Sequence, residues 1–380
     1  MSVAAARDRA LRRPVHDDRT AAILGLALGL CFLVCFLTGV WSHLQQHPPG
    51  WLTLPPRPSW LYRVTQGTHV ATGYATVPLL LAKLWSVYPR LFRWPPVRGV
   101  AHAVERAMLV PLVCGAVFML VSGIANVSRW YPWGFYFPAA HYAVAWITIG
   151  SLVVHVGAKA ALTRAALSRS SPRRPTPSGT LGRRGFLASV AAAVGIVTVT
   201  TAGQTVPALR PATLFAQRRT DIGSQGLPVN KSAAQAGVTE SAADDGYRLR
   251  VTGDVGQELV LTAGELDDLA RHEVELSIAC VEGWSASAHW RGVPVAELLD
   301  LVGVPRGRAI TVVVESLQRG GRYRSSELNH LQARDPDTVL AVAVNGERLN
   351  LDHGFPCRLI GPNRPGVLQT KWVSELVVRA

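Results

Sequence analysis

Residues 21–43 read AAILGLALGLCFLVCFLTGVWSH and contain no acidic residue, lysine or arginine. An uninterrupted apolar run of about 20 residues has the length that a helix needs to cross a bilayer. Three comparable runs follow at about residues 66–88, 103–124 and 140–162, and a fifth, at 186–206, is richer in Ala, Gly and Thr. The sequence therefore predicts an N-terminal all-α transmembrane bundle of four helices, followed by a fifth spanning helix.

The composition agrees with a membrane portion. Of the 380 residues, 48% are hydrophobic, and the formal net charge is +14. Lysine and arginine blocks between apolar segments are typical of membrane topology, and no helix-turn-helix or base-stacking pattern accompanies the charge. We therefore expect no nucleic-acid partner. Three of the five cysteines lie in apolar runs, so the sequence indicates no disulfide framework.

The basic residues also predict the orientation. They cluster before the first apolar run, between the second and third, and between the fourth and fifth, whereas the other two loops contain only Arg57, Arg63 and Arg129. By the positive-inside rule the N-terminus is then cytoplasmic. Residues 1–165 would form the membrane domain, 166–185 a basic cytoplasmic linker, and everything after the fifth span would lie outside the cell membrane.

The fifth span begins with residues 180–187, TLGRRGFL. Paired arginines followed by Phe-Leu and a weakly apolar stretch resemble a twin-arginine export signal. A twin-arginine translocon exports folded proteins, so this interpretation implies a domain loaded with its cofactor before export. The alternative is that Arg183 and Arg184 are two more cytoplasmic charges of the positive-inside pattern. We expect the segment to remain as an anchor.

The character of the chain changes after the last span. Residues 207–245 are rich in Ala, Gly, Ser, Thr and Gln and are typical of an extracytoplasmic tether or an irregular wrapping segment. Residues 246–380 contain short β-branched runs such as AITVVVES, divided by Gly, Asp and Asn turns, and two short helical patterns. This pattern predicts one mixed α+β domain.

Four histidines of the first half are candidates for metal binding. His141 and His155 are fourteen residues apart in the fourth span, which places them about 21 Å apart on nearly the same helix face. His69 and His102 lie near the ends of the second and third spans. Ionisable residues inside a membrane are costly and usually functional. We expect His69 to pair with His141 near the outer side and His102 with His155 near the inner side.

Neutral imidazoles are good axial ligands of haem iron. The arrangement of these histidines resembles the four-helix b-type cytochromes that serve respiratory formate dehydrogenases and related enzymes. The resemblance implies one or two haems b and exchange of electrons with membrane quinone or quinol. His43 is a rival ligand on the outer side and His16 on the inner side, and the alternative for all of them is an interfacial polar residue.

Residues 279–285, ACVEGWS, place a single cysteine at the end of a strand-like run. A thiolate prefers soft or high-valent metals, whereas a lone buried cysteine is more often a small core residue. The longer stretch CVEGWSASAHWRGVPVAELL, together with residues 339–378, resembles the sulfite oxidase superfamily of molybdopterin oxidoreductases. Within that superfamily it is most similar to the catalytic subunits of periplasmic methionine sulfoxide reductases.

This resemblance implies a molybdenum–molybdopterin cofactor with Cys280 as the catalytic thiolate ligand. It assigns cofactor contacts to residues that we name here by their positions: Asn230, Ser316, His353, Arg358, Gln369, Thr370 and Lys371. An arginine fork suits a phosphate group. Cys357 is expected to be a core residue.

The resemblance further implies oxygen-atom transfer coupled to the quinone pool. Val281, Glu282, Gly283 and Trp284 follow the cysteine where sulfite-oxidising relatives place basic residues, so we expect reduction of a neutral S-oxide or N-oxide. The absence of a dimerisation domain after KWVSELVV points the same way. Arg322 and Arg324 keep sulfite oxidation open. Two further alternatives are a non-catalytic haem and pterin electron carrier and a reductase that uses haem alone.

Overall fold

The computed structural model describes residues 14–91, 99–168 and 182–380. Most of the basic residues before the first span, part of those between the second and third, and most of the predicted 166–185 linker lie outside this described part of the chain.

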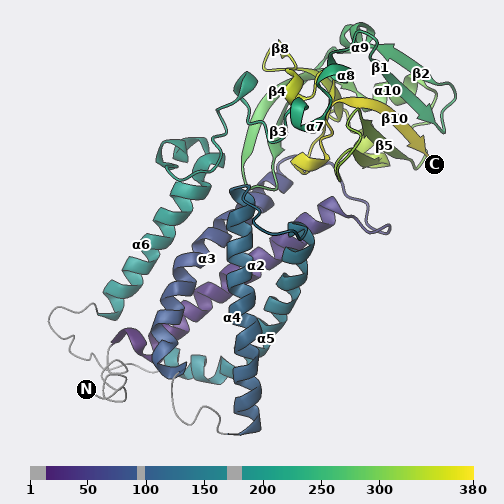
Figure 1. Cartoon of the computed structure of the whole chain (residues 1–380). Coiled ribbons are helices and arrows are strands. Elements are labelled where there is room, and N and C mark those ends of the chain that lie inside the picture. The colour runs from purple at the N-terminus through teal and green to yellow at the C-terminus, as the bar shows by residue number, and fades with distance from the viewer. Residues whose placement is uncertain (1–13, 92–98, 169–181) are drawn as a thin grey trace. The chain divides into compact units, whose positions relative to one another are not determined.

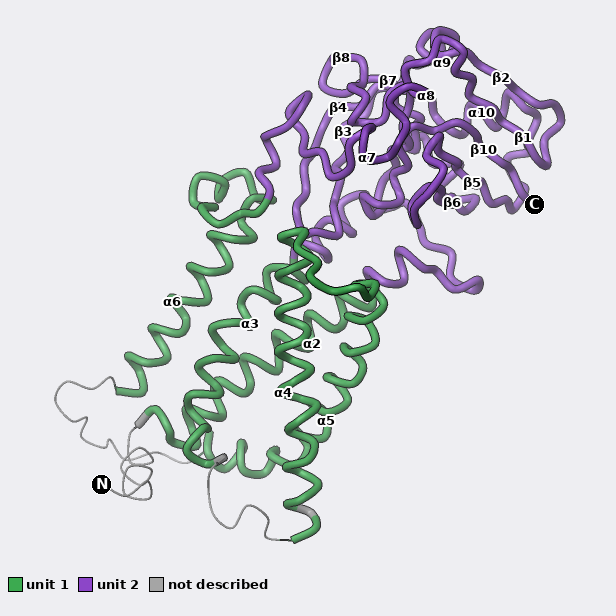
Figure 2. The backbone as a smooth tube through the Cα atoms, viewed as in Figure 1, with its two compact units in different colours: residues 1–40, 68–217 green, residues 41–67, 218–380 purple. Residues whose placement is uncertain are grey.

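The described chain forms two compact units (Figure 2). Unit 1 comprises residues 1–40 and 68–217, and unit 2 comprises residues 41–67 and 218–380. The connection between the first two long helices therefore belongs to the unit that also contains the C-terminal domain. The sequence pattern had assigned that connection to the membrane domain.

Five helices are long and apolar enough to cross a membrane (Figure 1). They are α2 (Asp18–Gln46), α3 (Leu61–Leu91), α4 (Val100–Val127), α5 (Phe137–Ser168) and α6 (Arg183–Ala202). Short 3-10 helices precede and follow them: η1 (Pro14–His16), η2 (Gly203–Thr205) and η3 (Pro207–Ala212). All five apolar runs of the sequence are thus helical, as predicted.

The helices of unit 1 bury few apolar side chains among themselves. One small cluster joins α2, α3 and α6 through Leu24, Leu79, Ala82 and Val190. By contrast, many leucines of α2 point away from the protein, and Leu30 remains 63% exposed. Apolar side chains turned outward are what a helix needs when its surroundings are lipid tails.

Unit 2 is a mixed α+β domain, as the sequence predicts. Its short helices are η4 (Ser224–Gly226), α7 (Ala233–Ala236), α8 (Thr239–Ala243), α9 (Ala263–Leu269), α10 (Val295–Leu301), α11 (His330–Arg334), η5 (Leu351–His353) and η6 (Gly366–Leu368). Its strands are β1 (Arg248–Gly253), β2 (Leu259–Thr262), β3 (His272–Ala279), β4 (Ser285–Pro294), β5 (Thr311–Ser316), β6 (Ser325–Asn329), β7 (Val339–Val344), β8 (Glu347–Arg348), β9 (Arg358–Ile360) and β10 (Val373–Arg379).

The strands form two sheets. One has the order β2-β1-β10-β5-β6, in which β1 and β10 are parallel and the other neighbours antiparallel. The second has the order β3-β4-β7-β8, and β9 also pairs with β7. The antiparallel pairing of β3 with β4 runs without interruption from His272 opposite Gly292 to Ala279 opposite Ser285. The turn between these two strands therefore has a fixed position at the end of the second sheet.

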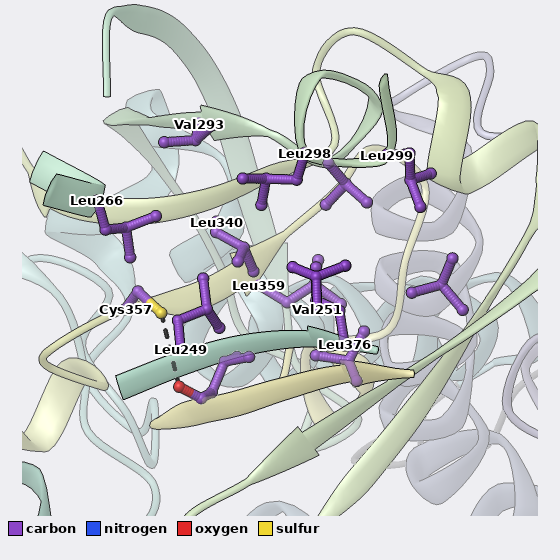
Figure 3. Close-up of a cluster of buried hydrophobic side chains, with 14 of the residues drawn as sticks. Leu249, Val251, Leu266, Val293, Leu298, Leu299, Leu340, Cys357, Leu359 and Leu376 are labelled. Carbon is purple, nitrogen blue, oxygen red and sulfur yellow. Dashed lines mark hydrogen bonds between the residues drawn. The ribbon is translucent and has the colours of Figure 1, made fainter. Parts of the chain in front are cut away.

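The main core of unit 2 is formed by side chains from both sheets and from α10 (Figure 3). Leu249 and Leu376 come from the first sheet, Leu340 from the second, and Leu298 from α10, and all four are fully buried. Burying a leucine side chain contributes about 2 kcal/mol. This shared core joins the two sheets, and the loops at their ends extend from it.

Residues 218–245 are part of unit 2. Ser232 caps α7 in a capping box with Gln235, and Ala233 N donates to Asp352 Oδ1 at 2.8 Å. Ala233, Val238 and Ala242 are buried against Trp372. Of the two interpretations of this region, the wrapping segment fits residues 218–245.

Candidate functional site

Cys280 lies in the tight turn between β3 and β4. Its backbone N–H donates to the carbonyl of Trp284 at 2.9 Å, and Gly283 N donates back to the carbonyl of Cys280 at 3.0 Å. Gly283 has a φ of 88°, a left-handed conformation that glycine adopts without strain. The turn therefore fixes where the cysteine side chain begins, and only 3% of Cys280 is exposed.

The sulfur atom of Cys280 accepts hydrogen bonds from nitrogen donors. Asn230 Nδ2 lies 2.9 Å and the backbone nitrogen of Glu282 3.4 Å from Sγ. Donors of this kind stabilise negative charge on sulfur, the form in which cysteine binds metals. Asn230 is fifty positions earlier in the chain, so the structure brings together two residues that the sequence resemblance had connected.

Two cations lie in the same region: Lys371 interacts electrostatically with Cys280, and the buried Arg358 interacts with Lys371. Arg358 on β9 donates from Nη1 to the carbonyl of His353 at 3.0 Å and from Nη2 to that of Gln369 at 3.4 Å. Lys371 Nζ donates to the carbonyls of Lys231 at 2.9 Å and Asp352 at 2.6 Å. Since Lys231 follows Asn230, these contacts connect the Lys371 ammonium to the Cys280 turn.

Burial makes these positive charges costly. It lowers the pKa of Arg358 to about 9 and, with the help of the nearby Arg358, the pKa of Lys371 to about 7. The hydrogen bonds described above end on neutral carbonyl oxygens, which satisfy the donors without cancelling the charge. An anionic group bound here would remove the cost, because opposite charge favours the protonated form.

His353 completes this side of the site. Its Nε2 donates to the carbonyl of Ser224 at 2.7 Å, and burial lowers its pKa to about 4, so the imidazole is neutral near pH 7. The next residue, Gly354, has a φ of 111°, and a Cβ there would lie 3.0 Å from Cβ of Arg358 and 3.1 Å from that of Lys371. Glycine lets the two cation-bearing segments approach each other.

The remaining predicted cofactor residues follow on nearby loops. Gln369 and Thr370 are 2% and 3% exposed, and Thr370 Oγ1 lies 2.7 Å from Ser326 Oγ. Ser316, at the end of β5, donates from Oγ to the carbonyl of Lys371 at 2.7 Å. Ser316 therefore holds the backbone of the loop that carries Lys371.

Several buried polar atoms of this region have no hydrogen-bond partner among the described residues. They are Arg358 Nε, Asn230 Oδ1, Gln369 Oε1 and Ser285 Oγ. A buried polar group without a partner costs about 1–3 kcal/mol, and such groups are usually satisfied by a ligand or water. A thiolate ligand, two buried cations and unpaired amide and guanidinium atoms together fit a molybdopterin, whose phosphate is anionic and whose ring is polar.

Sequence reasoning assigned no role to Arg364 and expected Glu282 to disfavour an anionic substrate. Arg364 is 3% exposed, donates from Nη1 to Gln332 Oε1 at 2.8 Å, and has a pKa lowered to about 10 by burial. The sequence signal for this residue was its position in GPNRP, residues 361–365, a turn-like stretch with one glycine and two prolines. Glu282 is 8% exposed, and Trp284 Nε1 lies 3.4 Å from its Oε2.

The other candidates of unit 2 are placed as follows. Arg322 and Arg324 are exposed on the loop before β6. In the same loop a Cβ at Gly321 would lie 3.8 Å from Lys231 Nζ, so the loop approaches the site. Cys357 is fully buried in the main core, where burial raises its pKa to about 12. It is a core residue, as expected.

Within unit 1 the structure brings the rings of His69 and His141 close together in an edge-to-face arrangement. Their ring centroids are 6.4 Å apart, with the ring planes at 70°. His69 Nδ1 lies 2.9 Å from the carbonyl of Cys35, and His141 Nδ1 lies 3.1 Å from Ser122 Oγ. With each Nδ1 engaged, each Nε2 is the nitrogen left to bind a metal.

The separation of these two rings suits a shared metal ion. A ligating imidazole nitrogen lies about 2 Å from its metal, so two imidazoles on opposite sides of one ion have centroids about 6 Å apart. Glycines lie beside both rings: a Cβ at Gly39 would be 3.1 Å from His69 Cε1, and one at Gly123 would be 3.7 Å from His141 Cε1. His69 and His141 therefore stay the predicted pair of haem ligands near the outer side.

His102 and His155, the predicted inner pair, lie at different positions along their helices. Gly115 contacts Thr148 across the α4 and α5 interface, and Glu105 forms an ion pair with Lys159. This antiparallel register places His155 opposite a position near residue 108, which leaves His102 about 9 Å further along the helix axis. The structure thus does not bring His102 and His155 to the same depth.

The rival histidines have other surroundings. His16 is 2% exposed, and its Nδ1 lies 3.2 Å from the carbonyl of Ser86. His43 stacks on His47, with ring centroids 4.9 Å apart. In the arginine pair, Arg183 is the first residue of α6 and forms an ion pair with Asp17 at 3.3 Å.

Comparison with known proteins identifies the class of the C-terminal domain. Residues 236–380 match the family model of the oxidoreductase molybdopterin binding domain. The chain is 31% identical to sulfite oxidase of Arabidopsis thaliana over 166 positions, which cover 35% of this chain and 42% of that protein. This domain belongs to the sulfite oxidase superfamily of molybdopterin oxidoreductases.

Other relatives are named as reductases or reductase subunits. The chain is 31% identical to the putative protein-methionine-sulfoxide reductase subunit YedZ1 of Azospira oryzae, over 35% of this chain and 48% of that protein. It is 36% identical to an NADH nitrate reductase of Arabidopsis thaliana, over 23% of this chain and 11% of that protein. The chain thus spans less than half the length of these curated relatives.

Among solved structures, the sulfane dehydrogenase SoxCD from Paracoccus pantotrophus is similar over 35% of this chain and 38% of that chain, with 25% identity and a TM-score of 0.32. A TM-score of that size supports no conclusion about the fold.

Proposed function

We propose that this chain is a membrane-anchored, molybdopterin-dependent oxidoreductase that removes an oxygen atom from a neutral S-oxide or N-oxide outside the cytoplasm. The observation that carries the proposal is the surrounding of Cys280, in which nitrogen donors reach the sulfur and the Lys371 ammonium interacts with the cysteine electrostatically. A core cysteine such as Cys357 lacks such an anion-binding neighbourhood and has a strongly raised pKa.

The residues present would divide the work as follows. Cys280 would ligate molybdenum through Sγ, Arg358 and Lys371 would hold the phosphate of the pterin, and Gln369 would contact the pterin through its unpaired oxygen. When bound, the cofactor supplies oxygen-atom transfer coupled to a two-electron change. Reducing an S-oxide consumes two electrons and two protons and releases a sulfide and water.

Glu282 favours reduction over sulfite oxidation. Its carboxyl group is buried two residues after Cys280, where it would repel an approaching dianion. A neutral S-oxide or N-oxide experiences no such repulsion. Sulfite oxidation is the second candidate, because Arg322 and Arg324 lie on a loop that approaches Lys231 and could attract an anion.

We further propose that haem b bound by His69 and His141 carries the electrons and exchanges them with membrane quinone or quinol. The ring separation of 6.4 Å and the engaged Nδ1 atoms support this assignment. A second haem, with His155 as one ligand, would need a partner other than His102. Export through the twin-arginine translocon accounts for Arg183 and Arg184 at the start of α6.

The direction of electron flow can be tested on the detergent-solubilised full chain. Its haem is reduced with dithionite, excess reductant is removed, and the haem absorption is followed without oxygen while methionine sulfoxide is added. We expect reoxidation of the haem, and none in Cys280→Ser. Haem reduction of the oxidised protein by sulfite, without reoxidation by the sulfoxide, would instead support sulfite oxidation.

Metal and haem contents separate the remaining candidates. The proposal requires both molybdenum and haem in the purified chain. Haem without molybdenum would indicate a reductase that uses haem alone. Both groups without activity toward sulfoxides, N-oxides or sulfite would indicate an electron carrier.

A further inference from the structure

Residues 41–67 comprise the end of α2, the connection to α3 and the start of α3, and they contact the oxidoreductase domain at many points. Asn329 Nδ2 donates to the carbonyl of Leu54 at 2.9 Å. Arg57 Nε and Nη2 lie 3.0 and 3.1 Å from the two carboxylate oxygens of Asp335, and the same guanidinium pairs with Asp337. A bidentate guanidinium–carboxylate pair fixes both position and orientation. We call residues 41–67 the strap.

Asn363 binds the strap with three of its polar groups. Its Nδ2 donates to the carbonyl of Pro55 at 3.0 Å, its Oδ1 accepts from Tyr62 N at 2.9 Å, and its backbone N–H donates to the carbonyl of Ser59 at 3.3 Å. Asn363 is 3% exposed and has a φ of 53°, which asparagine tolerates better than most residues. Both polar atoms of the Asn363 side chain therefore form hydrogen bonds with the strap.

The turn that contains Asn363 leads to the 280–284 turn. Pro365, two residues after Asn363, forms a parallel bridge with Ala279, the residue before Cys280. The strap is thus connected to Cys280 from one side through the GPNRP turn.

The strap also contacts the 280–284 turn directly. Gln66 Nε2 donates to the carbonyl of Val281, the residue after Cys280, at 3.2 Å. One turn earlier on the same face of α3, Tyr62 is 1% exposed, and its phenol is close enough to Cys280 for an electrostatic interaction. Its hydroxyl lies 3.1 Å from Ser42 Oγ, also in the strap.

Gln66 is held in place for this contact. It is 6% exposed, and its Oε1 is buried without a hydrogen-bond partner among the described residues. Because the side chain is buried, its hydrogen bond to the Val281 carbonyl lies in a medium of low dielectric, which strengthens it.

We propose that the strap is a wall of the molybdenum site and that Gln66 is a positioning residue, which orients the Cys280 sulfur by holding the backbone of the 280–284 turn. The inference deepens the proposed function and rests on it for the identity of the metal. It also implies that the substrate approaches Cys280 from a side other than the one that Tyr62 and Gln66 cover.

The first test is the Mo(V) electron paramagnetic resonance spectrum of the full-length Gln66→Met variant. Methionine keeps the length of the side chain and lacks the N–H donor. We expect shifted g values at unchanged molybdenum content, because the thiolate changes its orientation on the metal. The matched control is Gln46→Met, since Gln46 lies in the strap but bonds only to Ser42 in the contacts described. Its spectrum should equal that of the wild type.

The second test needs no metal. In full-length chain produced without the pterin cofactor, iodoacetamide labelling of Cys280 is timed by peptide mass spectrometry. Loss of one hydrogen bond should raise its rate about threefold to tenfold in Gln66→Met, and Gln46→Met should leave it unchanged. Asn363→Asp, which loses one donor to the strap at equal size, provides an independent variant if Gln66→Met does not fold.

The outcomes separate the two proposals. Unchanged g values and an unchanged labelling rate in both variants would overturn the role of the strap, even in an active enzyme. A wild-type chain that takes up no molybdenum would overturn the proposed function, whereas faster Cys280 labelling in the same preparation would still support the strap.

Discussion

The two units of this chain use leucine in opposite ways. On α2, Leu26, Leu30 and Leu37 are 56%, 63% and 59% exposed, whereas Leu249 and Leu340 in the oxidoreductase domain are fully buried. Lipid makes outward leucines favourable, and water makes inward ones favourable. The contrast extends to the proposed sites: paired imidazoles among apolar helices in one unit, and a thiolate among buried cations and amides in the other.

If the two sites are chemically independent, Cys280→Ser should abolish oxygen transfer and leave the haem spectrum intact. We expect turnover to fall about 1000-fold or more, as happens when an enzyme loses a residue that takes part in the chemistry. Sulfoxide reduction with a dye donor and the absorption spectrum of the reduced protein are the two measurements. Cys114→Ser, on the exposed surface of α4, is the control. Retained turnover in Cys280→Ser would refute the metal-ligand assignment.

The reciprocal change is His141→Leu. It should remove about one haem per chain, because one imidazole of the pair is lost, while the molybdenum content stays the same. Haem is measured as its pyridine complex and molybdenum by mass spectrometry. His69→Leu should give the same loss. If both variants keep their full haem content, these histidines are not ligands.

The contrast in leucine exposure predicts a difference in stability. Leu340→Ala should lower the free energy of unfolding of its unit by about 2–5 kcal/mol, because it leaves a cavity in a closed core. Leu33→Ala, at a position on α2 that is 47% exposed, should cost less than about 1 kcal/mol. Thermal unfolding of the solubilised chain gives both values. Equal losses would mean that Leu33 is packed against protein.

The smallest expected effect concerns Lys371. Its pKa of about 7 in the folded chain lies below the value of an unfolded lysine, so between about pH 7 and 10 the unfolded state binds more protons. The cofactor-free protein should therefore gain stability relative to Lys371→Met as the pH rises through this window, by at most about 1.4 kcal/mol per pH unit. Tm differences between the two proteins at pH 7, 8 and 9 measure it. A constant difference would mean that the ammonium stays protonated.

The pattern of apolar and β-branched residues along the chain was enough to predict the helices and the mixed α+β domain. Helix α3, for example, extends over Leu61–Leu91 around the apolar run at 66–88. Apolar length is a local property of the sequence, and so is strand alternation. The resemblance around CVEGWS also led to Asn230, whose contact with Cys280 no local pattern predicts.

The depth of the inner histidines was harder to predict. It was judged from the ends of the apolar runs, but α5 extends over Phe137–Ser168, beyond the run at 140–162. The position of a helix relative to its neighbour is set by packing contacts such as that of Gly115 with Thr148, which hydropathy does not record.

The strap escaped prediction for a different reason. Residues 48–60, PPGWLTLPPRPSW, have no hydrophobic period and were assigned to a loop of the membrane domain. Much of their binding uses main-chain carbonyls, such as those of Leu54 and Pro55, which every residue type supplies. Only tertiary structure reveals such contacts.

The position of the strap in the chain has a genetic consequence. The oxidoreductase unit is discontinuous: residues 41–67, from the end of α2 to the start of α3, are encoded ahead of α4, α5 and α6, and residues 218–380 are encoded after them. A gene fragment beginning after α6 would therefore encode a domain that lacks the partners of Asn329, Asn363 and Asp335. A gene exchange that preserves this unit would therefore have to include residues 41–67, between α2 and α3, as well as residues 218–380.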